Sequence, residues 1–262
     1  MHLKSIRLMG SLMLNFRNGG TLVQRMRAGL PCDELALWDG TRIEHPKGRL
    51  GLLEAVQEIW LERIYTNGFY RPANGDVIVD AGANIGLFAI SIASRNPRCR
   101  VIALEPFPEN FKYLQANVAR ARLNNVSVHE MALGAALGRG QMEAVGTRSL
   151  DHVLRVNSNL TSAKSNANGT PVIPLAGIFD LTHTSEVDFL KMDIEGSEHD
   201  VFANASSGLV GRFKRIAMEY HDRIVPGTLA LVQRVLSPTH ELTIRPSQME
   251  GCGILLARRR DL

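Results

Sequence analysis

The chain contains 262 residues, of which 45% are hydrophobic and 21% are charged. This apolar content is enough for one sizeable hydrophobic core, so we expect a globular protein with one large domain rather than two equal ones. The formal net charge is only +4, and the basic residues are scattered rather than arranged in a stripe, which argues against a nucleic-acid-binding protein. The three cysteines fit neither a disulfide framework nor a zinc site in number or spacing, so a reducing cytoplasm is the expected compartment.

The N-terminal 32 residues carry five basic residues and no acidic residue, interleaved with leucine, methionine and isoleucine. This pattern predicts an amphipathic helix that either covers the hydrophobic core or rests on an anionic membrane surface or a partner. Arg17 interrupts the apolar stretch and no small-residue cleavage site follows it, so we expect no secretory signal. No apolar run reaches the roughly 18–20 residues that a helix needs to cross a bilayer.

Two further elements complete an N-terminal extension that we expect to span residues 1–72. The dipeptide Asp39-Gly40 predicts the turn of a hairpin over 37–44. Apolar residues spaced by three and four predict a helix over 50–65 with one face on the main sheet.

Residues 73–262 are expected to form the main domain, because strand and helix patterns alternate there. This alternation predicts a mostly parallel sheet with helices on both faces. Only a short connection separates the last two strands, so they should pair antiparallel at one side of the sheet. The predicted elements are strand 77–80, helix 86–94, strand 100–104, helix 108–122, strand 126–131, strand 187–192, helix 197–205, strand 215–220, helix 226–236, strand 241–245 and strand 254–258.

The alternation is interrupted over 138–170, a segment rich in glycine, serine and asparagine. A long insertion between two strands of an α/β unit is either a lid, a substrate-binding excursion or a tolerated surface loop. The sequence leaves these alternatives open.

The first strand of the main domain ends in the motif Asp80-x-Gly82-x-Asn84-x-Gly86. Ligands of open parallel sheets bind beyond the carboxyl ends of the strands, and the first strand-to-helix turn is the usual contact. Gly82 allows close backbone approach to a ligand, and Gly86 allows the helix to start packed on the strand. Asn84 stands where a dinucleotide fingerprint often has a glycine, and the acid before the turn suits a cationic ligand better than a phosphate. A helix cap with two packing glycines is the structural alternative.

Two further strand ends indicate a nucleoside ligand. Glu105 ends the second strand about 20 residues beyond the glycines, where an acid commonly binds the two hydroxyls of a ribose. Ala132 and Leu133 follow the third strand in HEMALG, where the turn can lie over an adenine ring.

The most specific segment is DFLKMDIEGSEHDVF, residues 188–202. A buried strand leads into a turn that carries Asp193 and Glu195, and a helix with Glu198 follows. The helix dipole favours an acidic side chain in the first turn, so we expect Glu198 to stabilise the N-terminus of this helix. Asp193 and Glu195 have no such structural explanation and are candidate functional residues.

The segments DAGANIG, LEPFPENF, ALG and KMDIEGSE, in this order, resemble the FkbM family of S-adenosylmethionine-dependent methyltransferases. The resemblance covers roughly residues 54–258 and implies a Rossmann-like class I methyltransferase sheet of seven mostly parallel strands with an antiparallel last strand. It also implies O-methylation of a hydroxyl on a sugar, glycoside, polyketide or other secondary metabolite. The N-terminal extension and the 138–170 insertion lack family motifs and are expected to carry substrate choice.

The resemblance also assigns roles to individual residues. The acceptor and the methyl group would face Asp193 and Glu195, the ribose would contact Glu105, and the adenine would contact Ala132 and Leu133. The methionine part of S-adenosylmethionine would contact the glycine turn that contains Asp80, Gly82, Asn84 and Gly86.

The acceptor hydroxyl needs a base to take its proton, and a positioned base accelerates such a reaction by about 10²- to 10⁴-fold. The preferred base is His221 or Asp193, with Glu195 and Glu219 orienting the acceptor or cofactor. We assign no metal ligands, although a metal bridged by these four groups is an open alternative because hard cations bind several oxygens.

Two other functions remain open at this stage. A nicotinamide-dependent oxidoreductase can use the same kind of sheet, but the absent Gly-x-Gly-x-x-Gly motif argues against it. A catalytically idle methyltransferase-like binding subunit is the second alternative, because fold does not fix function. The acceptor's identity and the oligomeric state are not encoded in these motifs.

Overall fold

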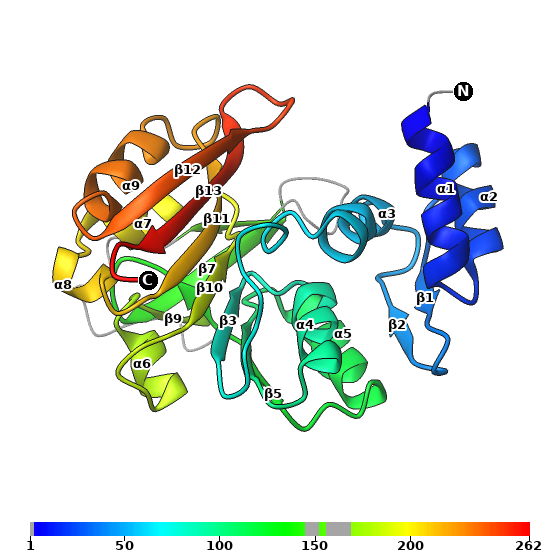
Figure 1. The fold of residues 1–262 in the computed structure, drawn as a ribbon, viewed down its shortest axis with the longest axis horizontal. Helices are drawn as coiled ribbons and strands as arrows, with labels where there is room; N and C mark the ends of the chain where they lie inside the picture. The colour runs from blue at the N-terminus through cyan, green and yellow to red at the C-terminus, as the bar shows by residue number, and fades with distance from the viewer. Residues whose placement is uncertain (1–2, 145–151, 156–168) are drawn as a thin grey trace.

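The computed structural model describes residues 3–144, 152–155 and 169–262. Its centre is a seven-stranded sheet in the order β12-β13-β11-β10-β3-β4-β5 (Figure 1). The pairs from β11 to β5 are parallel, and β13 is antiparallel to both β11 and β12. The predicted fold class is therefore confirmed. The strands are β3 Val77–Ala81, β4 Arg100–Leu104, β5 Val126–His129, β10 Phe189–Met192, β11 Arg215–His221, β12 His240–Pro246 and β13 Cys252–Arg259.

Two hydrophobic clusters cover the two faces of this sheet. Alternate residues of a strand point to opposite faces, so Ile78 of β3 joins one cluster and its neighbours Val77 and Val79 join the other. The first cluster contains α4 Leu87–Arg95 and α5 Pro108–Arg120, and the second contains α6 Gly177–Thr182, α7 Glu198–Ala203, α8 Ser207–Val210 and α9 Thr228–Leu236. The short helices α6 and α8 were not predicted.

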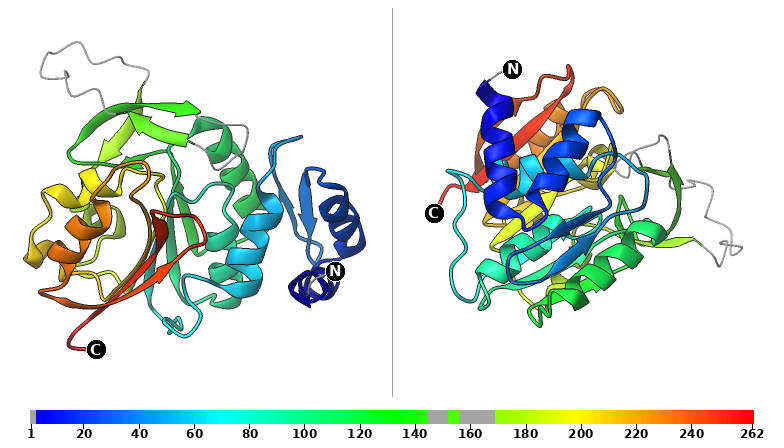
Figure 2. Two further views of the ribbon diagram at one scale, coloured as in Figure 1. Left: turned by 90° about the horizontal axis from the view of Figure 1, so that it is seen from above. Right: turned by 90° about the vertical axis from the view of Figure 1, so that its right-hand side faces the viewer.

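The N-terminal residues form two helices, α1 Leu3–Asn15 and α2 Gly19–Ala28, at one end of the molecule (Figure 2). Leu12 and Phe16 are buried, and the Phe16 ring lies 5.8 Å from the ring of Trp60. This end of α1 therefore covers the core, while Met13 and Leu14 stay exposed. Among the described residues, no helix is both long and apolar enough to cross a membrane.

The predicted hairpin is present as β1 Glu34–Ala36 and β2 Arg42–Glu44, which pair antiparallel. The predicted helix over 50–65 is shorter and divided: α3 Leu52–Ala55 continues as the π-helix η1 Val56–Glu62. This helix ends at Arg63, whose φ of 53° turns the chain sharply. It packs against α4, so it reaches the main sheet through that helix.

The 138–170 segment differs in part from the predicted irregular insertion. It begins with β7 Gly138–Ala144, contains β8 His152–Arg155 and ends at β9 Thr170–Ile173. With β6 Ala132–Leu133 these strands form a second sheet in the order β6-β9-β7-β8, on another side of the molecule from the N-terminal helices (Figure 2). The predicted lid falls mostly on residues 145–151 and 156–168, outside the described residues.

Candidate active site

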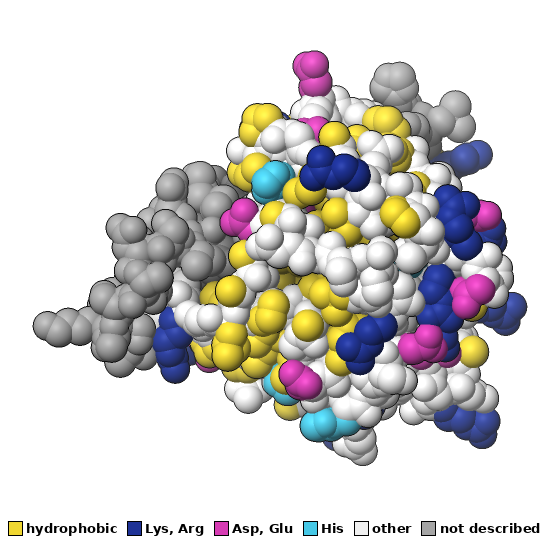
Figure 3. All heavy atoms as spheres, turned by 90° about the vertical axis from the view of Figure 1, so that its left-hand side faces the viewer, with side chains coloured by type: hydrophobic (Ala, Val, Ile, Leu, Met, Phe, Trp, Pro, Cys, Tyr) yellow, Lys and Arg dark blue, Asp and Glu magenta, His cyan; other side chains and the backbone are white. Residues whose placement is uncertain are grey.

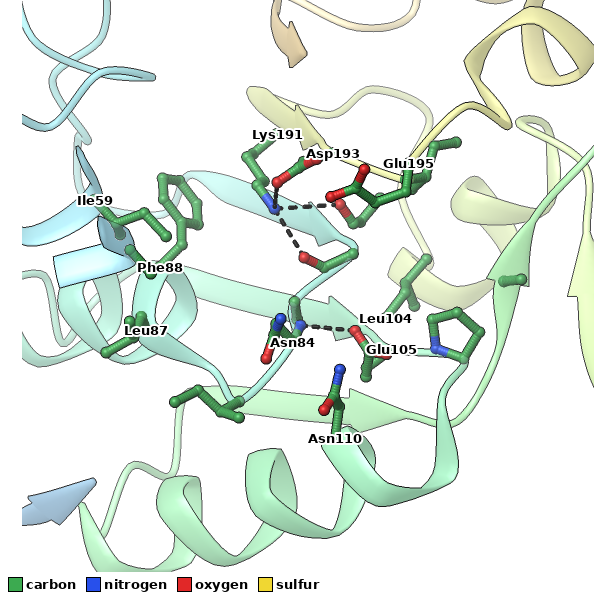
Figure 4. A pocket seen from close by; sticks show the side chains of 18 of the residues that line it. Ile59, Asn84, Leu87, Phe88, Leu104, Glu105, Asn110, Lys191, Asp193 and Glu195 are labelled. Carbon is green, nitrogen blue, oxygen red and sulfur yellow. Dashed lines mark hydrogen bonds and ion pairs between the residues drawn. The ribbon is translucent and has the colours of Figure 1, made fainter. Parts of the chain in front are cut away.

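A cavity lies at the carboxyl ends of the central strands, with a volume of about 930 Å³ that includes the part open to solvent. This edge of an open parallel sheet is where such folds bind their ligands. Seven of the predicted site residues line it: Gly82, Asn84, Glu105, Ala132, Leu133, Asp193 and Glu195 (Figure 4). The other four, Asp80, Gly86, Glu219 and His221, lie outside its lining.

The glycine turn is shaped by contacts within the protein. Gly82 has a φ of 76°, and a Cβ at this position would lie 1.7 Å from the backbone oxygen of Asp193. Gly82 therefore lets the turn after β3 touch the turn after β10. Gly86 has a φ of 93°, and a Cβ there would lie 2.8 Å from Leu114 Cδ1 in α5, so this glycine serves helix packing.

Glu105 forms the polar end of the cavity. Its carboxylate accepts hydrogen bonds from the backbone N–H groups of Asn84, at 2.7 Å, and Phe107, at 2.9 Å. Burial raises the pKa of Glu105 to about 7, against the lowering effect of these two hydrogen bonds. Each oxygen still has a lone pair for a ligand hydroxyl, and the walls beside it include Leu104 and Leu133. This combination of a carboxylate and apolar walls fits a nucleoside.

Asp80 is completely buried and forms an ion pair with Lys191, at 3.2 Å between Oδ1 and Nζ. Lys191 Nζ also donates to the backbone oxygen of Gly82, at 2.8 Å, and lies 3.8 Å from Asp193 Oδ2 (Figure 4). Burial lowers the pKa of Lys191, but the carboxylates of Asp80, Asp193 and Glu219 outweigh it and raise the pKa above its usual value. The side chain of Lys191 therefore holds the ends of β3 and β10 together.

Lys191 was not predicted as a site residue, although it lines the cavity. The available signal was a single charged residue inside the buried strand FLKM. A buried lysine needs a charged partner, and Asp80 is that partner.

Beyond Asp193 the cavity borders a cluster that we call the acidic corner: Tyr65, Asp193, Glu195, Glu198, Glu219 and His221. The Tyr65 hydroxyl lies 2.5 Å from Glu219 Oε1 and 3.3 Å from Asp193 Oδ2. His221 Nδ1 lies 3.0 Å from Glu198 Oε1, and its Nε2 lies 3.6 Å from Glu195 Oε2 and 3.8 Å from Glu219 Oε2. The structure thus brings all four predicted catalytic residues together.

Tyr65 and Glu198 are additional members that the sequence did not indicate. Glu198 begins α7, as expected, but it is fully buried and bonded to His221. Glu198 therefore belongs to the helix start, as predicted, and in addition fixes the imidazole of His221.

Burial and mutual repulsion set the proton affinities in the acidic corner. Burial and the charge of Asp193 raise the pKa values of Glu195 and Glu219 to about 8 each. Burial alone lowers the pKa of His221, but the hydrogen bond to Glu198 and the surrounding carboxylates raise it to about 10. A histidine with this pKa holds its proton at neutral pH, which makes it a poor base there.

Comparison with known proteins identifies the family. The methyltransferase FkbM domain matches residues 80–237. The 31-O-demethyl-FK506 methyltransferase FkbM of Streptomyces tacrolimicus is 28% identical over 205 residues, which cover 69% of this chain and 78% of that protein. Methyltransferase 1 of Beauveria bassiana is 25% identical over 178 residues, covering 60% of this chain and 68% of that one.

One relative is far longer than this chain. The AMB antimetabolite synthetase AmbE of Pseudomonas aeruginosa is 25% identical over 201 residues, which cover 64% of this chain but only 9% of AmbE. Among solved structures, magnesium protoporphyrin IX methyltransferase from Synechocystis with bound SAM covers 71% of each chain, with a TM-score of 0.43 and 13% identity.

The family match contains Asp80, the glycine turn, Glu105 and every member of the acidic corner except Tyr65. It excludes a nicotinamide-dependent oxidoreductase as the family assignment and supports S-adenosylmethionine as the cofactor of the cavity. The chain belongs to the FkbM family of methyltransferases.

Proposed function

We propose that the protein is an O-methyltransferase that methylates a hydroxyl of a small molecule such as a sugar, glycoside or polyketide. The observation that carries this proposal is the position of Asp193, whose side chain lines the cavity and also belongs to the acidic corner. The relative from Streptomyces tacrolimicus is named for methylation of an oxygen of FK506, which supports the same class of acceptor.

S-adenosylmethionine supplies an electrophilic methyl group when it is bound. The residues that would hold it are Glu105 at the ribose hydroxyls, Ala132 and Leu133 at the adenine, and the glycine turn at the methionine part. In that turn Gly82 and Asn84 line the cavity. Asp80 and Gly86 lie outside the lining: Asp80 is paired with Lys191, which does line the cavity, and Gly86 directly precedes α4.

The acidic corner would bind and activate the acceptor. A hydroxyl placed against Asp193 would give its proton to this carboxylate and accept the methyl group in its place. Asp193 is preferred over His221 as the base, because His221 lies outside the cavity lining and the carboxylates around it raise its pKa to about 10. Glu195 and Glu219 would orient the acceptor.

The charge pattern of one face of the molecule supports a small-molecule acceptor rather than a nucleic acid. On the face seen in Figure 3, Lys and Arg side chains lie among Asp and Glu side chains, without a continuous basic stripe. Nucleic-acid-binding proteins usually carry such a stripe.

The test is calorimetric titration of the purified chain with S-adenosylmethionine, its demethylated product and NAD, followed by a methyl-transfer assay over hydroxylated sugars, glycosides and polyketides. We expect binding of the first two ligands and not of NAD, and binding should be lost in Glu105→Ala. Product mass should increase by one methyl group, and alkaline-stable labelling should identify an ether. Binding of the cofactor with methylation only of nitrogen or carbon acceptors would overturn the proposal.

A further inference from the structure

Three side chains from two neighbouring strand ends point to one place in the acidic corner. Each of Asp193, Glu219 and His221 offers one donor atom, and the three atoms all lie within 4.8 Å of one another. The register explains this convergence. Met192 of β10 pairs with Met218 of β11, so Asp193 follows beside Glu219, and His221 lies two residues further on the same face.

The imidazole of His221 is held in a defined orientation. Glu198 is fully buried, and its Oε1 accepts the hydrogen bond from His221 Nδ1 at 3.0 Å. The other nitrogen, Nε2, therefore faces Glu195 and Glu219. A carboxylate that binds one nitrogen of a histidine is the usual partner of a metal-binding histidine, because it fixes the ring and makes the free nitrogen a better ligand.

An unused acceptor atom supports the same conclusion. Asp193 Oδ1 is buried and receives no hydrogen bond from the described part of the chain. The Tyr65 hydroxyl has one proton to donate and lies closer to Glu219 than to Asp193. A buried carboxylate oxygen without a donor is costly, and a cation would satisfy it.

The corner also contains more carboxyl groups than cationic groups. The carboxyl groups of Asp193, Glu195, Glu198 and Glu219 surround a single imidazole, that of His221. Lys191 Nζ lies 3.8 Å from Asp193 Oδ2, but it is also bonded to the backbone oxygen of Gly82 and paired with Asp80 at 3.2 Å. Buried carboxylates need a positive partner.

We propose that Asp193, Glu219 and His221 bind one divalent metal ion of the Mn²⁺ or Mg²⁺ class, with Glu198 as the positioning residue of His221. Two carboxylate oxygens and one imidazole suit such an ion and leave three of its six octahedral positions open. Ligation through Nε2 needs the imidazole without a proton on that nitrogen, so the ion takes the place of this proton.

The metal site defines the acceptor class more closely, and this extension rests on the proposed O-methyltransferase function. Open positions next to the cavity suit an acceptor that chelates through two adjacent oxygens, such as a vicinal diol or a hydroxy-carbonyl group. The ion would lower the pKa of the bound hydroxyl. Because Asp193 would then be occupied as a metal ligand, Glu195 in the cavity wall would replace it as the base that takes the proton, while the oxygen receives the methyl group.

The experiment uses the full chain, stripped with EDTA and desalted. MnCl₂ is titrated into it, and the free ion is followed by electron paramagnetic resonance and by calorimetry. We expect one Mn²⁺ per chain, displaced by excess Mg²⁺, and an affinity at least about tenfold weaker in Glu219→Gln and His221→Gln. Glu198→Gln should weaken Mn²⁺ binding by about tenfold as well, because the residue that accepts a hydrogen bond from a metal-binding histidine orients that histidine.

Glu241→Gln is the matched control, because this exposed residue of β12 forms an ion pair with Arg258 at 2.7 Å and is not part of the acidic corner; it should bind Mn²⁺ like the wild type. Circular dichroism melts check that each variant is folded. If a variant is unfolded, the wild-type stoichiometry and the rise of its melting temperature with Mn²⁺ decide the question. Absence of wild-type binding at about 1 mM Mn²⁺, or equal binding in all variants, would overturn the metal site.

Titration with the demethylated cofactor product on the same samples separates the two proposals. Binding of the product without Mn²⁺ binding overturns the metal site and leaves the methyltransferase function intact. Specific Mn²⁺ binding by wild type, lost in Glu219→Gln, supports the site even where no hydroxyl is methylated.

Discussion

The cavity has two sides that are built in different ways. The side formed by the glycine turn and Glu105 is organised by the backbone: positive φ angles and N–H groups set its shape. The acidic corner is organised by side chains from three separate segments, bonded through Tyr65 and His221. The glycine turn and Glu105 lie close together in the sequence, so short motifs specify this side of the cavity. The acidic corner depends on contacts between distant parts of the chain.

The largest effect is expected from Asp193→Asn, which removes a charge but keeps the shape of the side chain. If the acidic corner carries the chemistry, kcat should fall by about 10²- to 10⁴-fold. Affinity for the demethylated product should change by less than about threefold, because the backbone side of the cavity is untouched. Comparable losses of turnover and affinity would show that the two sides do not have separate roles.

Asp80→Ala tests the ion pair that joins the two sides. The change leaves Lys191 buried without its closest charged partner, so the free energy of unfolding should fall by about 3–5 kcal/mol. Urea denaturation measures this loss. The double variant Asp80→Ala with Lys191→Met should recover part of it, and no recovery would mean that the pair is not the origin of the effect.

Gly82→Ala breaks the contact between the two turns directly. Gly75 is a matched control, because it has a φ of 90° but open space around its Cβ position, whereas a Cβ at Gly82 meets the oxygen of Asp193 at 1.7 Å. Gly82→Ala should therefore lower the free energy of unfolding by about 1–3 kcal/mol more than Gly75→Ala. Equal losses in thermal melts would assign the effect to φ strain alone.

The smallest effect is expected from pH at Glu105. Its pKa of about 7 means that its ionised fraction falls from about 0.9 at pH 8 to about 0.1 at pH 6. In the proposed site the ionised form would accept hydrogen bonds from both ribose hydroxyls, so affinity for the demethylated product should weaken by up to about tenfold over this range. Calorimetry at several pH values measures it. Glu105→Gln should bind weakly with a flat pH profile; a retained slope would place the titrating group elsewhere.

The sequence predicted the backbone side well and the acidic corner incompletely. The β-branched residues of 77–80 predicted a strand, which is present as Val77–Ala81 with all five residues buried, and Glu105 follows at the expected distance. The four catalytic candidates were also brought together as predicted. Their roles remain predictions.

What the sequence did not reveal depends on register and on long-range contact. Lys191 meets Asp80 only because β10 pairs with β3 in the register Lys191↔Asp80. Tyr65 enters the corner because the π-helix ends sharply at Arg63. The second sheet was missed because its strands begin in a glycine-rich segment, where β-propensity is low.

The hydrogen bond of Tyr65 also has a consequence for the order of folding during synthesis. Tyr65 and Glu219 are separated by 154 positions, so the tyrosine leaves the ribosome long before its partner exists. Contacts of such separation form late, because the intervening chain must first be ordered. The residues proposed to hold the nucleoside end with Leu133 of β6, while the acidic corner also needs residues of β11. A nascent chain would thus contain every residue proposed to bind the nucleoside before it contains the complete set of proposed catalytic residues.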